Sequence, residues 1–171
     1  MRARAFSLLE LVVVVVIIGV IAAIAVPRMG GFAARSKTAA ASASVRQMQE
    51  LIVQYEGLNG TYPATLVPNW FAGGQIPANP YESTNPRAVQ VVHAGADVTE
   101  PTAKTLGGGA RPYWYNRDNG EVRARVPDLG HASATVSLYN AVNGTNLTAM
   151  SETKFNLVVD ETETITVDLG G

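Results

Sequence analysis

A single carboxylate stands inside the most apolar stretch of this chain, and its position needs a chemical explanation. Glu10 lies in the run FSLLELVVVVVIIGVIAAIAV, residues 6–26, which contains no other charged residue. A carboxylate within an apolar helix costs on the order of 2.5 kcal/mol or more unless a positive charge accompanies it. The sequence therefore predicts that Glu10 has a cationic partner.

Few other residues offer the chemistry of a catalytic or metal centre. The 171 residues include no cysteine and only two histidines, His93 and His131, which excludes thiolate metal sites, disulfides and HExxH helices. No nucleophile elbow, phosphate loop or dinucleotide-binding motif is present, so we expect that the protein is not an enzyme. A net charge of −1, from 13 basic and 14 acidic residues, gives no basic patch for a nucleic acid.

The apolar run fits a long N-terminal helix. At 1.5 Å per residue, residues 6–26 span roughly 30 Å, the thickness of the hydrocarbon core of a bilayer, so we predict a transmembrane helix. Arg2 and Arg4 precede the run without an acidic residue, which predicts a cytoplasmic N-terminus and export of the rest of the chain. Pro27 predicts a bend or a short unwound stretch near residues 27–31.

Two simpler interpretations of this N-terminus remain open. In the first, it is an ordinary signal peptide, cut after Ala23-Ile24-Ala25, which releases a chain that begins at Val26. In the second, it is a plain single-pass anchor. The protein would then be a secreted or membrane-anchored β-rich module for binding or adhesion. Both interpretations leave Glu10 unexplained.

The N-terminus resembles that of type IV pilins and of the pseudopilins of type II secretion systems. A short basic leader, residues 1–5, ends in a small residue and precedes FSLLELVVVVVIIGVIAAIAVP. The resemblance implies cleavage between Ala5 and Phe6 by a prepilin peptidase, followed by N-methylation of Phe6. Glu10 then becomes the fifth residue of the mature chain, and the resemblance implies that it pairs with the Phe6 amine of the next subunit and sets the register between helices.

The same resemblance implies an assembly function for the whole chain. Gly19 and Pro27 fall where the family tends to have a helix-loosening glycine and a helix-kinking proline. The chain would be stored as a precursor in the lipid of a bacterial inner membrane and then polymerised into a homo-oligomeric helical filament in the periplasm or outside the cell. The implied partners are a prepilin peptidase that also methylates, an inner-membrane assembly platform, and minor pilins or pseudopilins. A type IV pilus and a secretion pseudopilus both remain open.

The resemblance implies an α+β, pilin-like fold, in which the long helix packs on a small antiparallel sheet, and the remaining residues predict extra C-terminal strands. The helix is expected over residues 6–58, because Val45, Met48, Ile52 and Tyr55, with Leu51 and Leu58 beside them, form one apolar stripe. A proline-rich connector is expected at 59–88 and the antiparallel β domain at 89–171.

Four short segments of the β domain have the composition of strands. The segment RPYWYNRDNGEVRARVPD predicts a hairpin that joins residues 113–116 to 121–126 through a turn at Asn119-Gly120. The segments ATVSLYN, KFNLVVD and TETITVDL, at 134–140, 154–160 and 162–169, predict further strands. The turn Asn143-Gly144 is expected to separate two of them.

A calcium site is the one cofactor that the sequence leaves open. Asp118, Asn119, Glu121 and Asp128 carry oxygen ligands of the kind that calcium prefers. Major pseudopilins, which this part of the chain resembles, have a calcium site in this region, but the signature of that loop is not recognisable here, and Asp-Asn-Gly is a common turn. We therefore expect no cofactor, with Asp118 and Asp128 as the calcium candidates.

Overall fold

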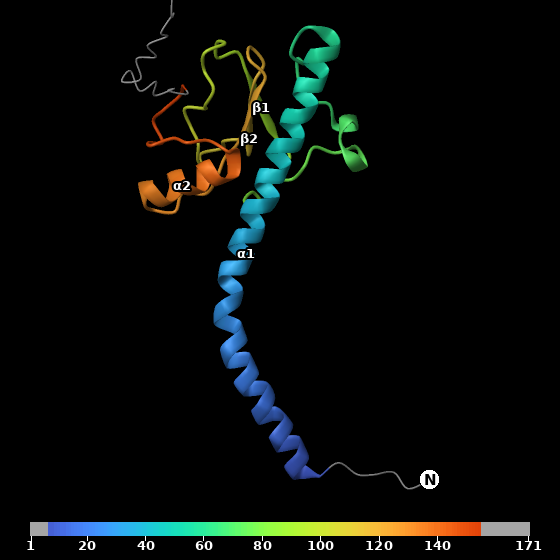
Figure 1. Ribbon diagram of the computed structural model, residues 1–171, viewed down its shortest axis with the longest axis vertical. Coiled ribbons are helices and arrows are strands. Elements are labelled where there is room, and N and C mark those ends of the chain that lie inside the picture. The colour runs from blue at the N-terminus through green and yellow to red at the C-terminus, as the bar shows by residue number, and fades with distance from the viewer. Residues whose placement is uncertain (1–6, 155–171) are drawn as a thin grey trace, which may run out of the picture.

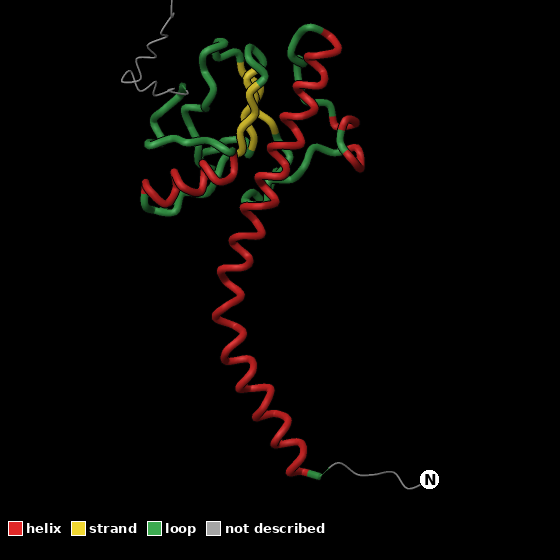
Figure 2. Tube along the Cα trace, in the orientation of Figure 1, coloured by secondary structure: helices red, strands yellow, loops and turns green. Residues whose placement is uncertain are grey.

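The computed structural model describes residues 7–154, apart from the side chains of residues 25–30. Figure 1 shows one long helix, whose C-terminal half carries a small domain and whose N-terminal half projects away from it. The elements are α1 (Leu8–Asn59), the 3-10 helices η1 (Pro68–Trp70) and η2 (Ala72–Gly74), β1 (Val89–Val92), β2 (Tyr113–Asn116), β3 (Glu121–Ala124) and α2 (Ala132–Asn143). Figure 2 shows that loops make up much of the domain.

Both ends of α1 are capped. At its start, the Ser7 hydroxyl accepts from the Leu9 N–H (3.3 Å), and the Glu10 carboxylate accepts from the Ser7 N–H (3.0 Å). This reciprocal arrangement is a capping box, which satisfies backbone donors that a helix start leaves without partners. At its end, Gly60 adopts a left-handed conformation (φ 70°) that stops the helix, close to the predicted end at residue 58.

The helix continues through residues 27–31, where a bend or a short unwound stretch was expected. No unwound stretch occurs at residues 27–31, since α1 is a single helix from Leu8 to Asn59. Figure 1 shows a gentle curve along α1 instead of a break. A proline inside a helix removes one backbone hydrogen bond, and curvature can absorb its ring without ending the helix.

The structure does not confirm the transmembrane prediction for residues 6–26. In the part of the chain that the structure describes, no helix is both long enough and apolar enough to cross a membrane. Residue 6 and the side chains of residues 25 and 26 lie outside that part.

The predicted apolar stripe packs α1 on the sheet. Val45, Met48 and Ile52 are buried in the core cluster that also contains Tyr113 and Tyr115 of β2. Two members of the predicted stripe lie at its margin: Tyr55 is half-buried and packs on the Trp70 ring, with centroids 5.3 Å apart, and Leu58 is exposed. Leu58 lies in the last turn of α1, beside the cap at which the chain leaves the helix.

The sheet has the order β1-β2-β3 and is mixed, so the prediction of a purely antiparallel sheet was wrong. The predicted hairpin is confirmed, with β2 and β3 antiparallel and Tyr113 opposite Ala124. β1 lies parallel to β2, with Val89 opposite Tyr113. Residues 93–112 form a long crossover that returns the chain to the same end of the sheet, as a parallel pair requires.

The strand expected at residues 134–140 is a helix. Val136, Tyr139 and Val142 recur every three residues, which places them on one face of α2, where they are buried in the core. Gly144 (φ 67°) ends this helix and does not turn a hairpin. The expected strand at 162–169 lies outside the described residues, as does all of the one at 154–160 except Lys154.

Side-chain amides from both helices cover the outer edge of β3. Gln49 of α1 donates to the Gly120 carbonyl (3.0 Å) and accepts from the Val122 N–H (3.3 Å). Asn143 of α2 accepts from the Ala124 N–H (2.7 Å) and donates to its carbonyl (3.0 Å). These two amides take the positions that a neighbouring strand would otherwise occupy.

The two tyrosines of β2 predict opposite effects of the same substitution. Among the described residues, the buried Tyr113 hydroxyl has no hydrogen-bond partner, whereas the Tyr115 hydroxyl donates to the Pro63 carbonyl (2.8 Å). Tyr113→Phe is expected to leave the free energy of unfolding unchanged or to raise it by about 1 kcal/mol, and Tyr115→Phe to lower it by a similar amount. Urea unfolding of both variants measures this difference.

The same tyrosines predict the response to alkali. Burial raises the pKa of Tyr113 and of Tyr115 to about 12, above the value of about 10 for an unfolded chain. Their contribution to stability is therefore complete below pH 10 and is lost as the pH rises towards 12. Each phenylalanine variant should lose part of this alkaline decline, and an unchanged decline in both variants would contradict the assignment.

Candidate assembly surface

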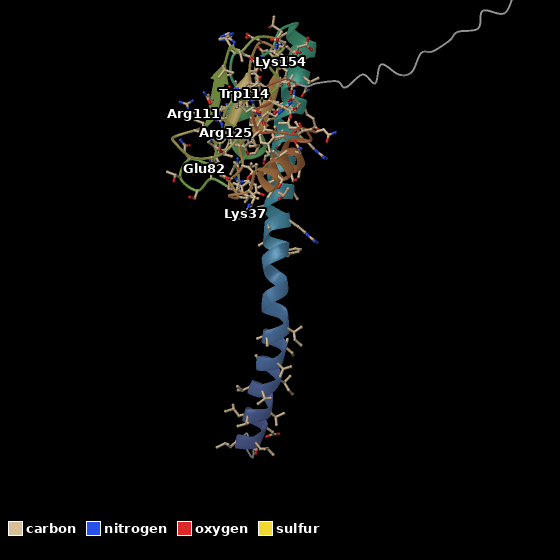
Figure 3. The ribbon with its side chains drawn as sticks, turned by 90° about the vertical axis from the view of Figure 1, so that its left-hand side faces the viewer. Lys37, Glu82, Arg111, Trp114, Arg125 and Lys154 are labelled. Carbon is tan, nitrogen blue, oxygen red and sulfur yellow. The ribbon has the colours of Figure 1, made fainter. Side chains whose placement is uncertain are left out.

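The N-terminal part of α1 exposes apolar side chains on all its sides. Its leucines, valines and isoleucines between residues 8 and 24 are each 46–80% exposed. Figure 3 shows side chains projecting from opposite sides of this part of the helix, well away from the domain. A helix that is apolar all round is stable only in apolar surroundings, which here means other helices or lipid. We call residues 8–24 the assembly surface.

Glu10 lies near the N-terminal end of the assembly surface. Its carboxylate accepts the Ser7 N–H of its own chain, and no cationic group among residues 7–154 forms an ion pair with it. Ala5 and Phe6, the predicted cleavage and methylation residues, lie outside the described part of the chain. The pairing of Glu10 with the Phe6 amine of another subunit therefore stays a prediction.

The other two predicted assembly residues lie within α1. Gly19 faces open space, with no atom within 4 Å of where a Cβ would stand, so a neighbouring helix can approach its backbone closely. Pro27 is part of the continuous helical backbone, and its side chain lies outside the described residues.

A buried ionic cluster holds the domain together. Glu100 is 2% exposed; it pairs with Arg123 of β3 (Nε–Oε1 2.7 Å) and accepts from the Tyr139 hydroxyl of α2 (2.6 Å). Burial and the adjacent Glu100 carboxylate raise the pKa of Tyr139 well above its ordinary value. Burial by itself would lower the pKa of Arg123. The negative charges of Glu100 and Glu121 have the larger combined effect, so the pKa of Arg123 is raised. The cluster therefore joins α2, the sheet and the crossover.

A second buried cation anchors the last described residues. Lys104 is 2% exposed, and its ammonium donates to the backbone carbonyls of Pro101 (2.8 Å), Met150 (3.0 Å) and Glu152. Burial lowers the pKa of Lys104, although the nearby carboxylates of Glu100 and Glu152 act in the opposite direction. Through this side chain, residues 150–152 are fixed to the crossover.

The calcium candidates have other partners. Asp118 accepts from the Gly95 N–H (2.8 Å) and contacts His93 (2.9 Å), and these two hydrogen bonds lower the pKa of its carboxyl. Asp128 accepts from the Gly130 N–H (2.9 Å) in the turn before α2. Within the described residues, no group of three His, Cys, Asp or Glu side chains is arranged to hold a metal. Calcium binding stays a prediction.

Similarity to known proteins agrees with this arrangement. Residues 1–26 match the model of the prokaryotic N-terminal methylation motif. The type IV major pilin protein PilE1 of Neisseria gonorrhoeae is 25% identical over 123 residues, which cover 70% of this chain and 67% of that protein. In these two respects the chain is similar to type IV pilins. No solved structure matches it. The matched residues 1–26 include the assembly surface.

Most of the polar residues that fix this domain carry no signal in the sequence. Glu100, Lys104 and Gln49 lie in segments without a recognisable motif. Asn143 did carry a signal, because an Asn-Gly pair after a three-residue apolar spacing is also typical of a helix end. Giving that spacing more weight than strand composition would have located both α2 and its cap.

Proposed function

We propose that this chain is the structural subunit of a type IV pilus-like filament, which polymerises through its assembly surface. One observation carries the proposal: residues 8–24 expose apolar side chains on all sides, while the domain buries its own core. Among the described residues, none of those side chains belongs to the core cluster of the domain. Their burial requires other copies of the same helix, with lipid as the alternative before assembly.

The magnitudes agree with assembly through this surface. Burial of one valine, leucine or isoleucine side chain contributes about 1.5–3 kcal/mol. Association costs roughly 4–15 kcal/mol of translational and rotational freedom. The burial of several such side chains between neighbouring subunits offsets this cost. The pairing of Glu10 with the Phe6 amine then selects one axial register among the many that an all-apolar helix would accept.

The proposed life of the chain has two stages. A precursor is anchored in the inner membrane with its N-terminus in the cytoplasm, and a prepilin peptidase cuts between Ala5 and Phe6 and methylates Phe6. An assembly platform, with minor pilins or pseudopilins, then adds the subunit to a filament in the periplasm or at the cell surface. The match of residues 1–26 to the methylation motif supports this processing.

Mass spectrometry of the N-terminus, on protein from the bacterium that makes it, tests the proposal. The expected mature chain begins with N-methylated Phe6, and the precursor is expected to persist in a strain without the peptidase. A mature chain that begins at Val26 would contradict the proposal and support a secreted binding module with an ordinary signal sequence.

Deletion of the gene separates the two kinds of filament. Similarity to a type IV major pilin favours a pilus, so loss of surface filaments with normal protein export is the expected result. Blocked export of secreted enzymes, with surface filaments intact, would instead indicate a secretion pseudopilus.

A further inference from the structure

The sheet has one covered edge and one open edge. The open edge is β1. On its inner side, the Ala88 and Val92 carbonyls accept hydrogen bonds from the Tyr113 and Arg117 N–H groups. Because hydrogen bonds alternate along a parallel strand, the backbone groups of Val89 and Val91 point outward. Arg111 donates to the Val89 carbonyl (2.8 Å). Among the described residues, the N–H and C=O of Val91 have no partner beyond the sheet. A further strand therefore has free groups with which to pair.

A groove of about 800 Å³ runs beside this open edge. It is lined by β1, by the loop that contains Gly107–Gly109, and by Arg111, Trp114 and Arg125. Figure 3 shows these three labelled side chains together on one side of the domain.

Two arginines, Arg111 and Arg125, line the groove, and its one lining carboxylate, Glu100, is paired with Arg123. Arg125 is 3% exposed and donates to the Ala103 carbonyl and the Gln90 side chain (2.6 Å each) and to the Arg111 carbonyl. No carboxylate in residues 7–154 pairs with Arg111 or Arg125. An occupant that carries negative charge would supply the missing counter-ions.

The described chain ends beside this groove. The Thr153 carbonyl accepts from the N–H groups of Thr99 (3.1 Å) and Glu100 (3.2 Å), and Lys154 pairs with Asp97. Asp97 and Thr99 follow closely after β1, and Glu100 itself lines the groove, so Lys154 lies near the C-terminal end of β1. The next residues are FNLVVDE, in which apolar side chains alternate before an acidic pair.

We propose that residues 155–161 of the same chain dock on the open edge of β1 as an antiparallel strand. Antiparallel pairing follows from the starting point, because a strand that leaves Lys154 must run back towards Val89. Seven extended residues reach roughly 23 Å, more than the roughly 13 Å length of β1. This reach brings Asp160 and Glu161 to the end of β1 where Arg111 lies.

Disulfide trapping tests the proposal directly, since the chain has no cysteine of its own. Val92→Cys, on the groove side of β1, is combined with one cysteine substitution at a time at residues 155–159. A docked strand predicts that cross-linking within one chain alternates along these five positions. Val53→Cys, on an exposed part of α1, serves as the matched control and is expected to cross-link at background level.

Two results of the trapping would overturn the proposal. Cross-linking at background level, or equal at all five positions, would mean that no strand docks on β1. Disulfide-linked dimers in place of cross-links within one chain would assign the segment to the edge of a second copy.

Hydrogen exchange provides an independent measurement on the chain without cysteines. The Val91 amide is expected to exchange at least tenfold more slowly in the full chain than in a chain that ends at Lys154. Arg111→Gln should reduce this protection, and Arg46→Gln, on the exposed surface of α1, should not. Equal exchange rates in the full and shortened chains would contradict docking.

Discussion

Cells that produce the Glu10→Val variant are expected to assemble few or no filaments. Without Glu10, each added subunit would bury the Phe6 amine among apolar helices with no opposite charge, at a cost of roughly 2.5–3.5 kcal/mol. At 1.4 kcal/mol per factor of ten, the concentration of subunit needed for assembly rises by roughly 60- to 300-fold. Electron microscopy of filaments sheared from cells, with immunoblots for total subunit, measures this loss.

The capping box supplies the control for this experiment. In Glu10→Gln the amide oxygen can still accept the Ser7 N–H, as the carboxylate does at 3.0 Å, but the charge is gone. Ser7→Ala removes the other half of the box, at a cost of about 1 kcal/mol to the start of the helix. If charge pairing matters, Glu10→Gln is as defective as Glu10→Val and Ser7→Ala assembles. Normal filaments from Glu10→Gln would show that Glu10 acts only as a helix cap.

Of the substitutions proposed for the domain, Glu100→Gln is expected to lower its free energy of unfolding the most. The substitution keeps the size of the side chain but leaves Arg123, whose side chain is 11% exposed, with Glu121 as its remaining partner. Removal of one partner from a buried ion pair costs about 3–5 kcal/mol, and the Glu121 contact places the expected value near the lower end. Urea unfolding of the full chain in detergent, followed by tryptophan fluorescence, measures the change.

Tyr139→Phe isolates the contribution of one hydrogen bond in this cluster, and Glu50→Gln serves as a control. Tyr139→Phe removes only the hydroxyl that donates to Glu100 (2.6 Å), and a hydrogen bond to a charged group contributes about 1.5–3 kcal/mol. Glu50→Gln changes an exposed glutamate on α1 and should alter stability by less than about 0.5 kcal/mol. A loss in Glu100→Gln no greater than that of Glu50→Gln would refute the role of the buried pair.

Local sequence patterns predicted correctly those elements in which the pattern itself reflects the packing. The spacing of Val45, Met48 and Ile52 identified the buried face of α1. The alternation on both sides of Asn119-Gly120 identified the hairpin, because its strands are neighbours in the chain. In each case a short stretch of sequence contains all the residues that form the pattern.

Long-range pairing could not be read in the same way. The parallel position of β1 depends on where a crossover of about twenty residues returns, which no local spacing encodes. α2 was mistaken for a strand because valine, threonine and tyrosine favour strands in general, whereas its three-residue spacing and burial against the core decide the structure.

The functional residues show the same contrast between local and long-range information. Glu10 could be identified from sequence because a charge inside an apolar run needs no partner to be noticed. The roles of Glu100 and Lys104 depend in large part on distant groups, the Tyr139 hydroxyl for Glu100 and the Met150 and Glu152 carbonyls for Lys104. Only the folded structure brings those groups together.

The amides of Gln49 and Asn143 on β3 also bear on what happens when many domains are crowded along a filament. A fibre of stacked β-sheets grows only if each sheet accepts a strand on both sides, so that every copy can bridge two neighbours. Here one side is permanently occupied by side chains from α1 and α2. Pairing at β1 could therefore join at most two copies, and none where residues 155–161 dock there as proposed, so the sheet cannot extend into an amyloid-like stack.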